Sequence, residues 1–423
     1  MLKKVMIILT VVLVSVLSAI TVSANNISYE TEEIDWTESG IKMAVDGKEI
    51  TFPDQKPLLD GKAGRTYIPI RFLAEALGAE VEWDNENQVV IIVNKGIEGE
   101  NTKNIYYLKI GSNKIVWARY ANGGNIATSV AVFYMPENIR PLLEGGRTVI
   151  PFRYIAELMG SQVYYDPTTG TANCVKRDMS SYKSSQRNGA VPVLNSLIGE
   201  YFIDELNQYR AKYELKPVTL NGDFSDMMTW AAFDQITHPG QRAYYQQHFP
   251  GTELHLFSWN RNTDINSRLQ NNETTSQEQM DYDVWHVGAY YQYIRTYLPN
   301  HPEYSKLNRD KKMELFNTYN YGENAFQMTS LLTRYITDYD LSAEIYEELT
   351  KNWGLNVRVR PDYIRDPHEN IIVYNEATMR NISKDAINVW HNSSGHRYMM
   401  QSNTLNRVGF ATVGEFTYMC GLR

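Results

Sequence analysis

The pattern of apolar and polar positions changes its period along the chain, and the change falls between residues 178 and 193. Before it, short apolar or alternating runs such as Glu80–Trp83 and Val89–Val93 are typical of strands, with brief helical stripes between them. Residues 178–193 carry serine, lysine, glycine and proline with little hydrophobic pattern, which predicts a linker. From Leu194 the spacing is helical, with one broad apolar face at Leu197, Ile198, Tyr201, Phe202, Leu206 and Tyr209. We therefore expect two folded parts, each with enough chain for its own core.

One short stretch of the first part occurs twice. The sequence GRTYIPIRFLAE begins at Gly64, and GRTVIPFRYIAE begins at Gly146, 82 positions later (146 − 64 = 82). In each copy a β-prone run precedes a helix that a proline starts and a glycine (Gly78 or Gly160) ends. Two strands then follow in each copy. A fixed offset over so many positions predicts duplicated structural units.

This first part resembles the copper amine oxidase N-terminal-like domain, also called a stalk domain, over about residues 38–177. The residues that carry the resemblance are Val45-Asp46-Gly47-Lys48, Pro57 and the stretch from Gly64 to Asp84. The resemblance implies a non-catalytic module of sheets and helices, common in exported proteins of Gram-positive bacteria. We expect no copper chemistry, because this region contains no histidine.

Each repeat also carries an arginine and a glutamate one helical turn apart. These are Arg71 with Glu75 and Arg153 with Glu157. Such a spacing predicts a structural ion pair on the helix surface. A ligand-binding role for these charges is the alternative.

The N-terminus has the pattern of a secretory signal peptide over residues 1–24. Lys3 and Lys4 precede the apolar run Val5–Val22, and Val22-Ser23-Ala24 is a small-residue cleavage site. An uncleaved membrane anchor is the alternative, since the apolar run approaches a membrane span in length. We expect a secreted protein, extracellular or associated with the cell envelope, with no membrane contact after cleavage. A net charge of −8 and a pI near 5.6 argue against a nucleic-acid partner.

The candidate chemistry lies in the second part, because every histidine stands at or beyond His238. The run from Trp390 to Arg397 reads W-x-x-S-x-G-H-R, with Ser393 and His396 inside it, and follows a predicted helix from Ser383 to Trp390. The two cysteines, Cys174 and Cys420, fall in different parts, and we expect buried thiols, with an inter-domain disulfide as the alternative.

Residues 194–423 resemble the CAP superfamily of cysteine-rich secretory and pathogenesis-related (SCP-like) proteins. The matching positions are Leu206-Asn207, Arg210, Leu215, Pro217 and Leu220, then Ala231-Ala232 with His238, and finally Trp390, Ser393, Gly395-His396-Arg397, Met400, Val408-Gly409 and Ala411. The resemblance implies an α-β-α sandwich with a cleft that gathers two histidines and an acid. About 150 residues separate His238 from Trp390, so we expect a large, mainly helical insertion at about 240–365.

Three glutamates compete for the acidic position of that cleft. Glu369 begins the spelling E-N-I, opens a β-like run and stands 21 residues before Trp390, and it is the acid we choose. Glu323 keeps the spelling G-E-N but falls where the pattern looks helical, and Glu376 has no asparagine after it. Ser393 stands where eukaryotic members carry a second acid.

The sequence predicts an α+β protein: duplicated stalk-type units followed by a CAP-like sandwich. We expect His238, Glu369 and His396 to form a cleft that binds an extracellular or cell-wall ligand. A hydrolase of peptide or glycan that uses the same three residues is the alternative, and an envelope protein with a vestigial cleft is a third. No cofactor is required, although two histidines and a carboxylate could hold a divalent cation such as zinc. The two histidines could equally serve only to complete hydrogen bonds.

Overall fold

The computed structural model describes residues 34, 36–62, 64–95, 102–121, 123–124, 127–166, 169–176, 194–222, 224–225, 228–229, 232, 308, 310, 321–327, 339–355, 371–413 and 416–422. The predicted signal peptide, the linker and most of the predicted insertion lie outside these residues. Helices and strands both build the described chain, so the expected α+β class is confirmed. Within it, no helix is long and apolar enough to cross a membrane.

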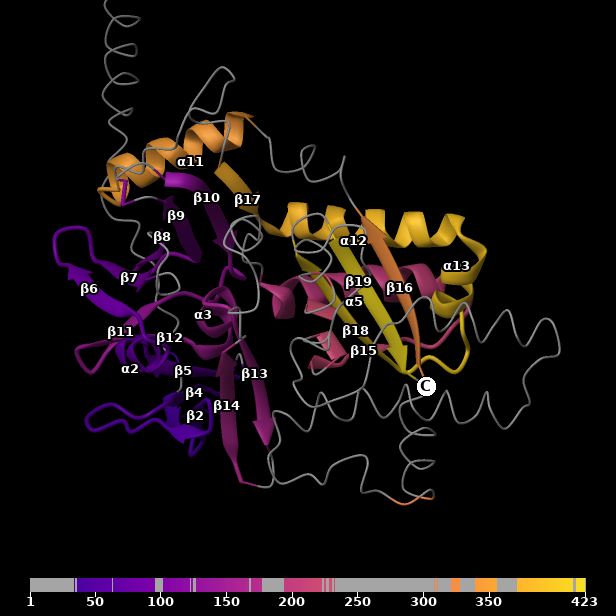
Figure 1. Cartoon of the computed structure of the whole chain (residues 1–423), viewed down its shortest axis with the longest axis horizontal. Coiled ribbons are helices and arrows are strands. Elements are labelled where there is room, and N and C mark those ends of the chain that lie inside the picture. Colours follow the sequence, from indigo (N-terminus) through magenta and orange to yellow (C-terminus); the bar gives the residue numbers. More distant parts are fainter. Residues whose placement is uncertain are drawn as a thin grey trace, which may run out of the picture.

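Two sheets, one antiparallel and one mixed, form the centre of the N-terminal part (Figure 1). The first has five strands in the order β1 (Trp36–Glu38), β4 (Leu58–Asp60), β5 (Arg65–Pro69), β12 (Arg147–Pro151) and β11 (Leu142–Glu144). The second has six, in the order β17 (Ile371–Tyr374), β10 (Ala127–Tyr134), β9 (Lys114–Ala121), β8 (Thr102–Lys109), β7 (Val89–Lys95) and β6 (Glu80–Asp84). All neighbours pair antiparallel except β17, which runs parallel to β10.

Two smaller sheets complete the described fold. One lies in the N-terminal part and has the order β13 (Ser161–Asp166), β14 (Thr171–Lys176), β2 (Lys42–Val45) and β3 (Lys48–Glu49). The other lies in the C-terminal part and has the order β15 (Thr219–Leu220), β18 (Arg407–Val413), β19 (Phe416–Leu422) and β16 (Tyr321–Gln327). The insertion was expected to be mainly helical, but its segment β16 is a strand, so the helical position predicted for Glu323 is wrong.

The two repeat segments have the same order of elements. The first runs β5, helix α2 (Ile70–Ala76), β6 and β7, and the second runs β12, helix α3 (Phe152–Leu158), β13 and β14. Pro69 and Pro151 precede the helices, and Gly78 and Gly160 follow them with φ of +86° and +79°. Glycine adopts this left-handed conformation without strain, which is why each helix stops there. The β5 and β12 strands pair with each other, whereas the two following hairpins join different sheets.

The charged pairs of the two repeats differ. Arg71 and Glu75 lie 3.6 Å apart on the surface of α2, as predicted. Arg153 instead donates to the carbonyl of Val163 at 3.0 Å. Glu157 is buried and accepts hydrogen bonds from the backbone N–H (3.1 Å) and the hydroxyl (3.0 Å) of Ser196. The predicted second ion pair is therefore wrong, because Glu157 is used to hold the first turn of the helix that follows the linker.

The two parts of the chain share buried cores rather than having one each. Helix α11 (Tyr339–Asn352) packs Ile345 and Leu349 onto the six-stranded sheet, against Val116 and Val132. A second cluster joins the buried side chains of α3 to those of helices α5 (Asn195–Ala211) and α12 (Glu376–Asn392). These contacts therefore join residues on opposite sides of the linker. The helix α11 and the strand β17 follow the linker in sequence but belong to the six-stranded sheet and its cover.

In the C-terminal part, α5 packs against both the four-stranded sheet and α12. Phe202 of α5 stacks on Phe410 of β18, with ring centroids 3.9 Å apart and planes 7° apart. On its other side it meets Trp390 of α12 edge to face, at 6.0 Å and 83°. These three aromatic residues are fully buried and set the position of the last turns of α12.

Gly409 is expected to tolerate no side chain. A Cβ atom there would lie 2.5 Å from the carbonyl carbon of Phe224, a backbone atom that cannot swing away. We expect Gly409→Ala to lower the free energy of unfolding by about 1–3 kcal/mol, as overpacking does. Urea unfolding measures it. The control is Gly395→Ala, where nothing lies within 4 Å and an equal loss would contradict the steric explanation.

Candidate functional site

The W-x-x-S-x-G-H-R run forms a corner between two helices. The side chain of Asn375 accepts a hydrogen bond from the N–H of Thr378 at 2.8 Å and so begins α12. Ser393 leaves the helix with φ of −102° and ψ of 123°, and helix α13 (Ser394–Met400) starts at the next residue. The N–H of Arg397 then donates to the carbonyl of Ser393 at 2.8 Å. The corner places His396 in the first turn of α13.

His396 is half-buried, and this burial lowers its pKa. The imidazole is therefore neutral at pH 7, because even its ordinary pKa lies below that pH. A neutral imidazole keeps one nitrogen lone pair that can accept a hydrogen bond, take a proton or bind a metal ion.

The lowered pKa of His396 has a consequence for stability. The unfolded chain takes up a proton on His396 first, near its ordinary pKa of 6.5, so acid favours unfolding. We expect the free energy of unfolding of the wild-type protein to fall between pH 7.5 and pH 5 by more than that of His396→Asn. Urea unfolding at the two pH values tests this. Equal losses in both proteins would show that His396 titrates alike in the folded and unfolded states.

A hydrogen-bonded network beside the corner was missed in the sequence. Nδ1 of His391 lies 2.9 Å from the hydroxyl of Tyr209, which also accepts from Nε2 of Gln401 at 3.0 Å. A guanidinium nitrogen of Arg397 donates to the carbonyl of His391 at 2.8 Å. Through its contact with Tyr209, His391 links α12 to α5. Its position one residue after Trp390 was the signal that could have found it.

Arg210 supports the far end of α13 from inside the protein. Its side chain is fully buried, and its guanidinium donates to the carbonyls of Lys216 (2.9 Å), Met400 (2.6 Å) and Ser402 (3.2 Å). Burial lowers its pKa. Among the described residues, its second terminal nitrogen has no hydrogen-bond partner. The charge is held by carbonyl dipoles at the C-terminal end of α13, where a positive charge is favourable.

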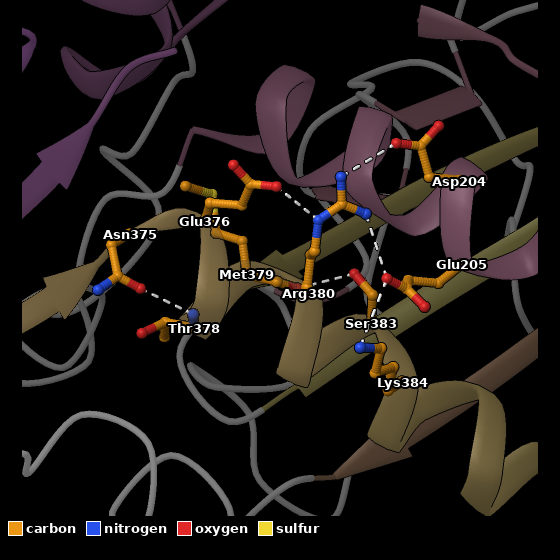
Figure 2. Close-up of polar contacts among 9 residues, drawn as sticks. All are labelled: Asp204, Glu205, Asn375, Glu376, Thr378, Met379, Arg380, Ser383 and Lys384. Atoms are coloured by element: carbon orange, nitrogen blue, oxygen red, sulfur yellow. Dashed lines mark hydrogen bonds and ion pairs between the residues drawn. The ribbon is translucent and has the colours of Figure 1, made fainter. Parts of the chain in front are cut away.

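Arg380 of α12 connects this helix to α5 through several polar contacts (Figure 2). It donates to Glu376 at 2.7 Å, Glu205 at 3.1 Å and Asp204 at 3.3 Å, and its guanidinium carbon lies 4.8 Å from the ring centroid of Tyr201. The hydrogen bond to Glu376 is the largest contribution to a raised pKa of Arg380. These contacts hold α12 on α5 and occupy Glu376 in a structural ion pair.

The structure describes only some of the predicted cleft residues. Ser393 and His396 lie on the α12–α13 corner, and Glu376 is the first residue of α12. Glu323 lies in β16, opposite Cys420 of β19. His238 and Glu369 lie outside the described residues.

The neighbouring strands distinguish the candidate acids. The strand after Glu369 is β17, which belongs to the six-stranded sheet of the N-terminal part. The strand that holds Glu323 is β16, which lies in the C-terminal sheet and contacts α13 (Figure 1). The fold therefore brings the strand with the spelling G-E-N next to the helix of His396.

The expectation of a bound cation stays a prediction. In the part of the chain that the structure describes, no three His, Cys, Asp or Glu side chains gather as a metal site requires. Of the proposed zinc ligands, His396 alone falls within that part, and its neutral ring suits such a role. Cys174 and Cys420 are both buried thiols, as expected.

No curated protein matches this chain in sequence. One similar solved structure is a cysteine-rich secretory protein from Staphylococcus aureus, 9% identical, with 84% of this chain and 90% of that chain covered and a TM-score of 0.21. Another is an extracellular protein containing an SCP domain from Bacillus anthracis, 9% identical, with 82% and 85% covered and a TM-score of 0.20. Residues 44–173 match the family model of the copper amine oxidase N-terminal domain, so the N-terminal part of this chain carries a domain of that type.

Proposed function

We propose that this chain is a secreted, cell-envelope-associated protein whose CAP-like C-terminal part binds an extracellular ligand in a cleft beside His396. A stalk-type N-terminal part presents this cleft. The observation that carries the proposal is the contact between α13, which bears His396, and β16, which bears the G-E-N segment. These segments stand more than sixty positions apart in the sequence (396 − 323 = 73), and they are the two motifs that the resemblance assigns to one cleft.

The cleft acid is Glu323 rather than Glu369 in this proposal. Support comes from the sheet order, because β16 belongs to the sheet that α5 and α12 contact, whereas β17 belongs to the six-stranded sheet. Glu376 is less suitable, since its carboxylate is held by Arg380. His238 completes the cleft as the second histidine.

Such a cleft binds ligands by hydrogen bonding and charge. A neutral His396 accepts a proton or a metal ion, while a carboxylate supplies negative charge, so the pair suits a divalent cation or a ligand rich in hydroxyl and amide groups. The partner we expect is a component of the cell wall. A hydrolase of peptide or glycan that uses the same residues is the second candidate, since a neutral imidazole beside a carboxylate can also act as a general base.

Zinc binding by the purified mature protein tests the cleft. We expect His396→Asn and Glu323→Gln each to weaken zinc affinity by about tenfold or more in calorimetry, the size of loss seen even for supporting groups around a metal. Glu369→Gln and Glu376→Gln are the matched carboxylate controls and should bind as the wild type does.

Other outcomes separate the alternatives. Loss of affinity in Glu369→Gln but not in Glu323→Gln would overturn the assignment of the acid. Unchanged affinity in His396→Asn would overturn the cleft itself. Release of peptide or glycan fragments from cell walls by the wild type, abolished in His396→Asn, would favour the hydrolase over the binding module.

A further inference from the structure

A cavity of about 210 Å³ lies in the N-terminal part, where the two repeat segments meet. It is bounded by the start of β5 from the first copy and by the end of β12, the start of α3 and the β13–β14 hairpin from the second. Its polar lining includes Arg65, Thr66, Arg153 and Tyr154, and Phe152 and Val163 belong to its apolar side. The cavity lining is thus about equally polar and apolar, with two arginines on its wall.

The arginines at equivalent repeat positions differ in how their charges are balanced. Arg147 pairs with Asp54 and Arg71 with Glu75. Arg65, the counterpart of Arg147 in the first copy, lies 3.3 Å from Glu200.

Arg153, the counterpart of Arg71, is the exception. Within the described chain, its hydrogen-bond partner is the carbonyl of Val163, which is neutral. The cavity wall therefore carries about one uncompensated positive charge.

Tyr154 gives a second and independent indication of a ligand. Its side chain is 1% exposed, and its hydroxyl has no hydrogen-bond partner among the described residues. The guanidinium carbon of Arg65 lies 5.4 Å from its ring centroid. Burial raises the pKa of Tyr154, so the hydroxyl keeps its proton and remains a donor. A buried donor without an acceptor is costly, and an acceptor atom in the cavity would remove that cost.

We propose that this cavity is a binding site for a small organic carboxylate with an apolar body. The free guanidinium nitrogens of Arg153 suit a planar carboxylate, which accepts two parallel hydrogen bonds from one arginine. One uncompensated charge matches a singly charged acid better than a doubly charged phosphate. Phe152 and Val163 contact the apolar body. The site is separate from the proposed His396 cleft, and neither proposal depends on the other.

The test uses the full mature chain and N-acetylleucine as the probe, with N-acetylleucinamide as its uncharged analogue. We expect the acid to bind at least about tenfold more tightly than the amide in an NMR titration, because a hydrogen bond to a charged group contributes most of the affinity. Arg153→Met should lose about tenfold or more, and Tyr154→Phe a smaller factor. Arg71→Met, the equivalent change in the first repeat, removes an arginine outside the cavity and should stay within about twofold of the wild type.

Three results would overturn the proposal. They are equal binding of acid and amide, unchanged binding in Arg153→Met, or tighter binding of inorganic phosphate than of the acid. A thermal unfolding scan of each variant shows whether it is folded. If Arg153→Met unfolds, Arg153→Lys replaces it, since lysine keeps the charge but loses the paired hydrogen bonds and should bind with an intermediate affinity.

Discussion

Replacing Arg210 by methionine is expected to lower the free energy of unfolding by about 3–5 kcal/mol. Methionine fills much of the same volume but cannot donate, so the buried carbonyls of Lys216 and Met400 lose the hydrogen bonds that now satisfy them. The opposing effect is relief of a buried charge that has no carboxylate beside it in the described structure. We expect the lost hydrogen bonds to outweigh this relief, because the guanidinium joins the end of α13 to the loop after α5. Urea unfolding at pH 7 measures the change.

Arg380→Met is the matched control for that prediction. Arg380 contacts three carboxylates but is about a quarter exposed, with 27% of its side chain accessible. Exposed ion pairs contribute little, so we expect a loss of only about 1 kcal/mol. If stability simply followed the number of ion pairs, Arg380→Met would lose more free energy of unfolding than Arg210→Met. A methionine variant of Arg210 that is as stable as the wild type would show that desolvation of the charge dominates.

Replacing Trp390 by alanine is expected to cost about 3–5 kcal/mol. The indole is fully buried between α12 and α5, and its loss leaves a cavity next to Phe202 that the surrounding helices cannot fill. Thermal or urea unfolding measures the effect. Trp83→Ala is the control, because Trp83 is 40% exposed on β6 and its loss leaves no cavity. Similar losses in both variants would contradict the packing role given to Trp390.

The repeat elements could be predicted from the sequence because their signals are local. A proline before each helix and a glycine after it act within a few residues, and the structure has both helices where the pattern placed them. The sheet that each hairpin joins has no such signal, since strand pairing depends on contacts between residues far apart in the chain. That is why β6–β7 and β13–β14 follow the same sequence pattern but belong to different sheets.

In the candidate site, too, local features could be predicted from the sequence and long-range contacts could not. The helix before Trp390 was predicted from the sequence, although α12 begins at Glu376 rather than at Ser383. The strand that holds Glu323 was mistaken for a helix, because short apolar runs do not distinguish the two. Arg210 and Glu157 are charged residues of the kind that usually lies on a helix surface, yet both are buried. Most of their partners lie in distant segments, Ser196 for Glu157 and Met400 and Ser402 for Arg210, which no local pattern records.

The parallel strand β17 has a consequence for the order in which the protein is made. Synthesis runs from the N-terminus, so β10 is complete long before Ile371 to Tyr374 exist to cover its edge. During that interval the five strands already present expose unpaired backbone groups along β10, and another chain can pair there. Two copies emerging together, or one copy stalled before residue 371, are therefore most prone to aggregate at this edge. Pairing of β17 with β10 ends this interval.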